Sequence, residues 1–254
     1  MAASMNKDLE TVCASHHEAC EENWAEIHSP EVSWRKKLIG EISDVFVVPR
    51  YVKLFYDNFG SMHNASFVEI GSGNGDLPRA ILNCNKGQIG RYIVSEQFPQ
   101  GVEWLKSQGL EAIQADAVNL PVADGSFDAS IAFDVMHHVP QPALMAKEMM
   151  RVARGRCLLV ESNGMSIFRK LKELTPAERA AGERSYSPWR YRSFFTQHTE
   201  FVVEEFAIYP FLFPFKCPGW FLPLLVRFNH AIEKIPFFRW QCSSVAISVR
   251  YRRK

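Results

Sequence analysis

The sequence predicts an α/β fold with a largely parallel sheet, and three observations carry this prediction. Strand-forming residues at 66–70 run directly into a glycine-rich turn, and from Ala65 onward strand patterns alternate with helix patterns. Strands that alternate with helices form parallel βαβ units with right-handed crossovers. The chain has 254 residues, 47% of them hydrophobic, which is enough for one large domain with a substantial core.

Residues 1–64 are predicted to form an N-terminal helical layer. Ser29-Pro30 is typical of a helix start, and a second helix after Pro49 would place Val52, Phe55, Tyr56 and Phe59 on one face. Two interpretations stay open for this layer: it packs against the sheet, or it forms a lid over a ligand site.

Residues 65–254 are expected to form the main part of one compact domain. The predicted strands are 66–70, 91–95, 112–115, 129–133, 157–161, 201–207 and 243–249. The predicted helices are 77–86, 98–108, 143–151, a polar segment within 163–186, and one beginning at Ser187-Pro188.

The stretch Phe67–Asp76 indicates a ligand site at the end of the first strand. It reads Phe-Val-Glu-Ile-Gly-Ser-Gly-Asn-Gly-Asp, and glycine allows positive φ and close approach of a ligand to bare backbone. A dinucleotide site spaces its glycines Gly-x-Gly-x-x-Gly, but here the third glycine comes one residue early. Glu69 would repel a pyrophosphate and could hold a cationic amino acid, directly or through water.

This pattern, Glu-x-Gly-x-Gly-x-Gly, resembles motif I of the class I S-adenosylmethionine-dependent methyltransferases. The resemblance covers residues 65–162 and implies a Rossmann-like seven-stranded mixed sheet, with the last strand antiparallel between strands five and six. Glu96 closes the second strand, where an acid can accept hydrogen bonds from both ribose hydroxyls. By the same resemblance, Asp116 and Ala117 lie at the adenine. The implied S-adenosylmethionine site comprises Glu69, Gly71, Ser72, Gly73, Gly75, Glu96, Gln97, Asp116, Ala117 and Phe133, with no metal.

Two further segments refine the resemblance. Leu120-Pro121 followed by Ser126-Phe127-Asp128 is similar to a small-molecule subfamily that includes the ubiquinone and menaquinone C-methyltransferases. Asp128 is predicted to cap strand four rather than to touch a ligand. His137 and His138 follow strand four and are candidates for a general base, since imidazole titrates near physiological pH. In many relatives a histidine here only packs, so this alternative stays open.

Residues 208–240 form an insertion rich in aromatic residues and prolines. Pro210 and Pro214 argue against a regular central strand. The insertion either adds a core layer to the sheet or forms an apolar acceptor pocket or interfacial patch. The expected acceptor is a small apolar, aromatic or lipid-like molecule methylated on O, N or C, and contact with a membrane surface is kept as a hypothesis.

Composition limits the other function classes. The net charge of +1 argues against nucleic acid as a partner, and six cysteines without a Cys-x-x-Cys pair indicate a reducing compartment. The N-terminus lacks a signal-like apolar run, and we expect a cytoplasmic protein. Two alternatives remain: a non-catalytic S-adenosylmethionine-binding module and, against the glycine spacing, a nicotinamide-dependent oxidoreductase.

Overall fold

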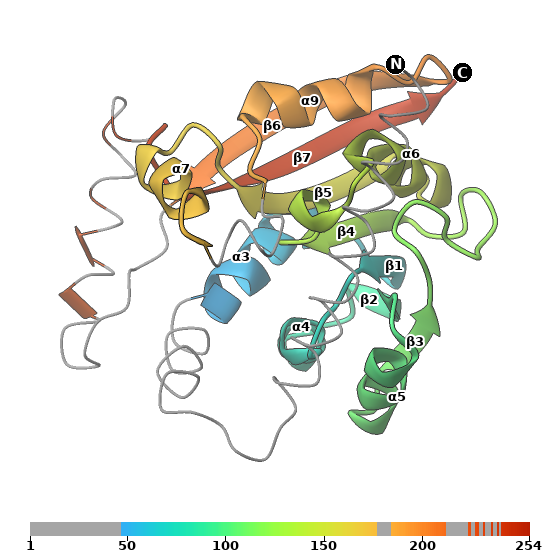
Figure 1. Ribbon diagram of the computed structural model, residues 1–254. Coiled ribbons are helices and arrows are strands. Elements are labelled where there is room, and N and C mark those ends of the chain that lie inside the picture. Colours follow the sequence, from blue (N-terminus) through green and yellow to red (C-terminus); the bar gives the residue numbers. More distant parts are fainter. Residues whose placement is uncertain are drawn as a thin grey trace.

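The protein folds around one seven-stranded mixed sheet. The computed structural model describes residues 47–176, 184–211, 223–224, 227–228, 231, 235, 238 and 240–254. Features predicted for residues 1–46 and for most of 212–239 lie outside the described residues. The strand order is β3-β2-β1-β4-β5-β7-β6 (Figure 1). The predicted fold class is therefore confirmed.

Among the described strands, β1 to β6 all run in the same direction, and β7 runs opposite to them. The register pairs β1 with β2 on one side and with β4 on the other, and β7 lies antiparallel between β5 and β6 as predicted. The order reverses between β1 and β4, which is where open α/β sheets bind ligands at the carboxyl ends of their strands. The strands are β1 (Ala65–Ile70), β2 (Ile89–Glu96), β3 (Glu111–Gln114), β4 (Ala129–Phe133), β5 (Arg156–Ser162), β6 (Phe201–Phe211) and β7 (Ser244–Arg253).

Successive strand residues point to opposite faces of the sheet, and apolar residues lie on both faces. Helices therefore cover both faces. On β1, Phe67 joins a core with α3, α4 and α5, whereas Val68 and Ile70 join a second core with α6 and α9. Figure 1 shows α6 and α9 together beside β5, β6 and β7, with α4 and α5 near β1 to β3. The helices are α3 (Val48–Phe59), α4 (Asp76–Asn83), α5 (Pro99–Ser107), the 3-10 turn η2 (Met136–His138), α6 (Pro142–Val152), α7 (Ile167–Glu173) and α9 (Pro188–Thr196).

One predicted boundary is wrong in the C-terminal third. β6 continues to Phe211 through Pro210, so the strand extends into the segment predicted as an insertion from residue 208. β6 is an edge strand, and an edge tolerates proline because one side of the strand needs no ladder hydrogen bond. Within 163–186, α7 confirms a helix in the first part of the predicted segment, whereas residues 177–183 lie outside the described residues.

Helix α3 packs its aromatic face on β1. Phe55 is fully buried, and its ring centroid lies 5.1 Å from that of Phe67. Phe59 contacts the same ring at 5.3 Å. The buried face also includes Tyr51 and Leu54, which the helical pattern had not singled out. Helix α3, which belongs to the predicted N-terminal layer, therefore packs into the core on one face of the sheet.

Among the residues that the structure describes, no helix is long and apolar enough to cross a membrane.

Replacing Phe55 with alanine should lower the free energy of unfolding by about 3–5 kcal/mol, because it leaves a cavity between α3 and β1. Urea unfolding followed by circular dichroism would measure the loss. Lys53→Ala is the matched control: Lys53 lies on the same helix and only forms an exposed pair with Asp57, which is worth about 0.3–0.5 kcal/mol. Equal losses for the two variants would show that α3 does not pack as described.

Candidate functional site

The turn after β1 has the open glycine backbone that the sequence predicted. Gly71 and Gly73 both have positive φ, 69° and 53°. A Cβ on Gly71 would come within 2.7 Å of the Val135 side chain, so only glycine fits beside the loop after β4. A Cβ on Gly73 would meet no atom within 4 Å. Gly73 therefore presents bare backbone to open space, where a ligand can approach it.

Glu69 lies on the α3 face of β1 and is only 2% exposed. The Tyr92 hydroxyl donates a hydrogen bond of 2.5 Å to its Oε2 atom. Burial raises the pKa of Glu69 from its ordinary 4.5 to about 7, although the hydroxyls of Tyr92 and Ser72 act in the opposite direction. This carboxyl group can therefore change its charge near neutral pH.

Glu96 connects the glycine turn to the end of β2. Its carboxylate accepts hydrogen bonds from the backbone N–H of Gly73 at 3.2 Å and of Gln97 at 2.8 Å. Burial raises the pKa of Glu96, while these amides favour its charged form. The acid that the sequence placed 21 residues after Gly75 thus lies directly at the turn.

A cavity of about 460 Å³ opens beside Glu96, between the loops that follow β2 and β3. Two of the predicted cofactor-site residues, Gln97 and Asp116, line it. Asp116 also accepts a hydrogen bond from the N–H of Val118, which closes a turn under its side chain. Ala117 packs against the core instead of lining the cavity. The lining residues are Gln97, Phe98, Pro99, Gln114, Ala115, Asp116, Asn119 and Pro121.

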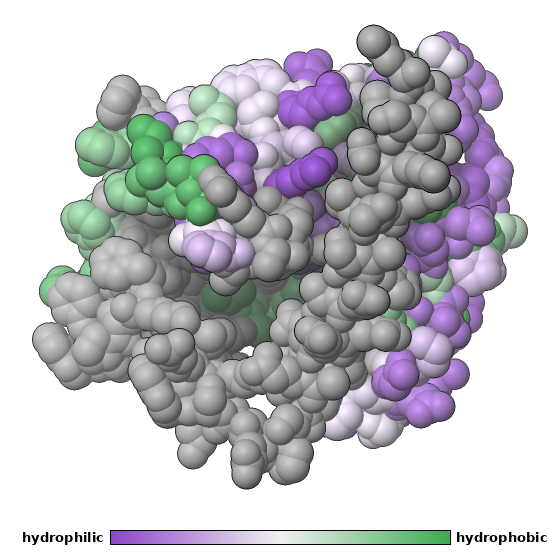
Figure 2. Space-filling model, in the orientation of Figure 1, coloured by the Kyte–Doolittle hydropathy of each residue, from purple (hydrophilic) through white to green (hydrophobic). Residues whose placement is uncertain are grey.

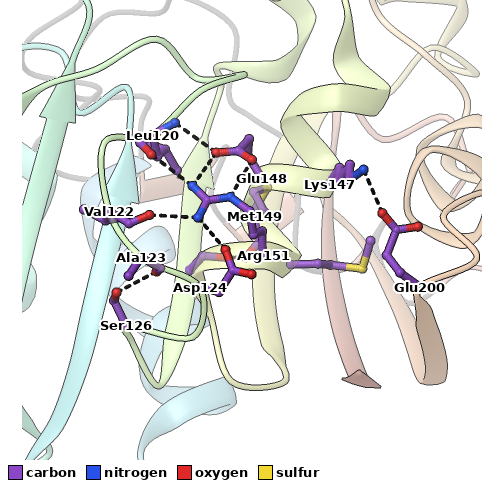
Figure 3. Close-up of polar contacts among 12 residues, drawn as sticks. Leu120, Val122, Ala123, Asp124, Ser126, Lys147, Glu148, Met149, Arg151 and Glu200 are labelled. Carbon is purple, nitrogen blue, oxygen red and sulfur yellow. Dashed lines mark hydrogen bonds and ion pairs between the residues drawn. The ribbon is translucent and has the colours of Figure 1, made fainter. Parts of the chain in front are cut away.

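Arg151 of α6 fixes the far side of this loop (Figure 3). Its guanidinium donates to the carbonyls of Leu120 and Val122, and to the carboxylates of Glu148 and Asp124. Glu148 in turn accepts the N–H of Leu120 at 2.9 Å. The loop with the Leu-Pro and Ser-Phe-Asp segments is therefore anchored to α6, which holds the cavity wall in place.

Asp128 caps the start of the sheet, in line with its predicted role at strand four. Its Oδ2 atom accepts hydrogen bonds from the N–H of Ser66 at 2.8 Å and from the Ser66 hydroxyl at 2.7 Å. Asp128 therefore joins the starts of β4 and β1, at the end of the sheet opposite the glycine turn.

The end of β4 meets helix α3. The Phe133 ring stacks on Tyr51 at 5.0 Å, and the Tyr51 hydroxyl donates a hydrogen bond of 2.5 Å to Asp134 Oδ2. Asp134 has a positive φ of 53°, a backbone conformation that few non-glycine residues adopt. Burial, followed by repulsion from Glu161, raises the pKa of Asp134 to about 6. Tyr51 thus links α3 to the end of β4, shortly before the two candidate base residues.

Glu161, at the end of β5, organises the loop that carries the two histidines. Its fully buried carboxylate accepts the N–H of Val135 at 2.9 Å and of Met136 at 2.5 Å through Oε1. Its Oε2 atom lies 2.6 Å from Nδ1 of His137. A carboxylate at Nδ1 fixes the orientation of the imidazole and favours the proton on that nitrogen. The rings of His137 and His138 lie 4.0 Å apart.

Most predicted site residues thus converge on the carboxyl ends of β1, β2, β3 and β4. Tyr51, Asp134 and Glu161 complete the site but belong to none of the motifs. Glu161 could have been predicted from the sequence, because it is an acid at the end of a strand predicted to be buried. A buried acid needs hydrogen-bond partners.

Part of the chain is similar in sequence to known methyltransferases. Residues 68–160 match the model of the methyltransferase domain family. An uncharacterized methyltransferase of Mycobacteroides abscessus is 28% identical over 105 residues, covering 40% of either chain. A protein of Botryococcus braunii described as sterol methyltransferase-like 1 is 29% identical over 92 residues, covering 34% of this chain and 24% of its own. The chain thus spans about two-fifths or less of the length of these curated relatives.

A solved structure has the same fold over nearly the whole chain. Geranyl diphosphate methyltransferase in complex with S-adenosylmethionine superposes with a TM-score of 0.59 at 14% identity, covering 89% of this chain and 94% of that one. The fold is that of the class I methyltransferases, and residues 68–160 correspond to their methyltransferase domain. The matches imply S-adenosylmethionine as the cofactor.

Glu69 should make stability depend on pH. Because burial raises its pKa from 4.5 to about 7, the folded state keeps a proton that the unfolded chain releases. Stability should therefore fall as pH rises through this window. Glu69→Gln should remove about 2–3 kcal/mol of that fall between about pH 5 and about pH 8. Urea titrations across this range would measure it.

The raised pKa of Asp134 also makes stability fall as pH rises. Asp134 is present in both the parent protein and the Glu69→Gln variant, so the difference between their stability curves isolates the contribution of Glu69. Parallel stability curves for the variant and the parent protein would contradict a raised pKa at Glu69.

Proposed function

We propose that this protein transfers a methyl group from S-adenosylmethionine to an O, N or C nucleophile of a small apolar or aromatic molecule. The observation that carries the proposal is the junction of Gly73 and Glu96: open glycine backbone and a buried acid meet beside a 460 Å³ cavity. The match of residues 68–160 to the methyltransferase domain supports it.

Each part of the cofactor has a chemically suitable partner. Glu96 would accept hydrogen bonds from the ribose hydroxyls, and its two amide donors keep it in position to do so. Asp116 and Gln97 would face the adenine from the cavity wall. The glycine turn and Glu69 would lie at the methionyl end, where a carboxyl that titrates near pH 7 can balance an ammonium group. The residues present therefore fit the cofactor that the comparisons imply.

His137 is the stronger of the two candidates for a general base. The Glu161 carboxylate at Nδ1 favours a tautomer whose Nε2 atom can accept a proton. When bound, the cofactor supplies an activated methyl group on its sulfonium. Alignment of the acceptor can contribute about 7–11 kcal/mol to lowering the barrier, and an oriented base can add about 10²- to 10⁴-fold in rate. Helix α3, linked to Asp134 by Tyr51, would serve as the inner wall of the site or as a lid over it.

An apolar acceptor is favoured by what surrounds this end of the sheet. Exposed apolar side chains lie on α7, which begins five residues after β5 ends at Ser162. Proteins of related sequence or fold are named for sterol and geranyl diphosphate methylation, which adds to this proposal without assigning either acceptor. A non-catalytic S-adenosylmethionine-binding module is the second candidate.

Glu96→Ala should weaken binding of S-adenosylhomocysteine by about tenfold or more, because a hydrogen bond to a charged group contributes about 1.5–3 kcal/mol. Isothermal titration calorimetry would measure the affinity. Glu103→Ala, an exposed acid on the neighbouring helix α5, is the control and should leave the affinity unchanged. An unaltered affinity in Glu96→Ala would refute the ribose assignment.

The function itself is tested by incubating the protein with methyl-labelled S-adenosylmethionine and an extract of its source cells, then partitioning the products. We expect label in the organic phase. His137→Gln should reduce transfer by about 10²-fold or more while S-adenosylhomocysteine binding persists, since the base acts on the acceptor. His138→Gln is the paired variant.

Label found only in aqueous products would refute an apolar acceptor. Cofactor binding without any transfer would favour the non-catalytic module, and loss of rate in His138→Gln alone would move the base to His138.

A further inference from the structure

We propose that helix α7, together with the apolar side chains beside it, binds the surface of an anionic lipid bilayer. Large apolar side chains on α7 and at its end are unusually exposed to solvent. The exposed fractions are 61% for Ile167, 77% for Phe168, 57% for Leu171 and 58% for Leu174. Single exposed apolar residues are ordinary, but four within eight residues form a patch that calls for a partner.

The helix is fixed in the fold, so this exposure is a property of a defined surface. The Ser166 side chain caps the helix by accepting the N–H of Arg169. The N–H of Ile167 donates to the Gln241 side chain at 3.1 Å, and Lys170 donates to the carbonyl of Ser185 at 2.9 Å. Both ends of the helix are thus tied to the body of the protein while its apolar residues point outward.

Neighbouring aromatic side chains extend the patch. Trp189, at the start of α9, is 52% exposed and stacks on Trp240 at 5.3 Å. Asn163 donates to the carbonyl of Trp240 at 3.0 Å, which holds this turn beside the α7 linker. Phe238 is 48% exposed. Figure 2 shows hydrophobic side chains gathered on the face where α7 lies in Figure 1, with hydrophilic ones next to them.

The charges on α7 favour an anionic bilayer over a purely apolar partner. Arg169, Lys170 and Lys172 alternate with the apolar residues, and Glu173 is the only acid of the helix. Glu173 pairs with Lys170 at 2.8 Å and with the largely buried Arg169 at 3.6 Å. Lys170 and Lys172 are exposed, so the basic groups that a bilayer would meet are these two. Helices that lie in a membrane interface combine Phe and Leu with Lys and Arg in this way, and tryptophan concentrates at the same depth.

The patch lies close to the proposed acceptor site. β5 ends at Ser162, one residue after Glu161, and α7 starts at Ile167. The patch therefore lies at the sheet end where the acceptor is proposed to bind, so docking would present the site to molecules dissolved in the bilayer. This account of its purpose rests on the proposed function, but bilayer binding itself does not. The sequence suggested membrane contact through residues 208–240, but most of that segment lies outside the described residues. The evidence for a membrane-binding surface therefore comes mainly from α7.

The test is co-sedimentation of the full chain with vesicles of phosphatidylcholine alone and of phosphatidylcholine with 30% phosphatidylglycerol. We expect binding to the anionic vesicles that weakens as salt is raised. Phe168→Ser/Leu171→Ser should lower the partition coefficient at least about tenfold, because it removes two apolar side chains from the contact. Leu144→Ser is the matched control: Leu144 is 41% exposed on α6, away from the patch.

Binding that is absent, or that is equal in the double variant and the parent protein, would overturn the proposal. So would a dimer in size-exclusion chromatography that the double variant abolishes, since the face would then bind a second copy. Binding of S-adenosylhomocysteine is measured on every variant: retained affinity shows that the variant is folded. Vesicle binding by a protein without cofactor affinity would sink the proposed function and leave this inference intact.

Discussion

Carboxylates that accept backbone N–H groups shape the loops at the carboxyl ends of the strands. A parallel strand that stops leaves amides that the ladder no longer satisfies, and leaving them buried without a partner is costly. Glu96 accepts the amides of Gly73 and Gln97, and Glu161 accepts those of Val135 and Met136. Each acid thereby joins two neighbouring strand ends. The turn that would face the cofactor and the loop that carries the histidines are held by the same kind of interaction.

This arrangement places several groups of hydrogen-bonded polar side chains at one end of an apolar sheet. Glu161 reaches His137, and Asp134 reaches Tyr51 on α3, so the first described helix is tied to the end of β4. Burial places the pKa of Asp134 at about 6 and that of Glu69 at about 7. Groups of this kind gather where charge has to change or be matched during a reaction. The bonded partners also explain how such acids are tolerated, since buried polar groups are stable only when hydrogen-bonded.

The cavity at the ends of β2 and β3 is separate from the exposed apolar surface that follows β5. The cavity near Glu96 is lined by polar and apolar residues alike, and Arg151 from α6 anchors the loop that forms one of its walls. Beyond β5, α7 presents Phe168 and Leu171 to solvent. A methyl donor from water and an acceptor from an apolar phase could therefore approach from different sides of the same strand ends.

The sequence by itself determined the sheet, the glycine turn and the acid after β2, because hydrophobic period and turn chemistry are local properties. Phe67–Asp76 and Glu96 could be placed from residue type and spacing, and Asp128 from its position directly before strand four. Tertiary structure decided which distant residues meet. Tyr51 and Asp134 are 83 positions apart, and His137 and Glu161 are 24 apart; both pairs depend on strand register and on how a helix sits on the sheet. It also decided that β6 continues through Pro210, since only strand order makes β6 an edge, where a missing N–H carries little cost.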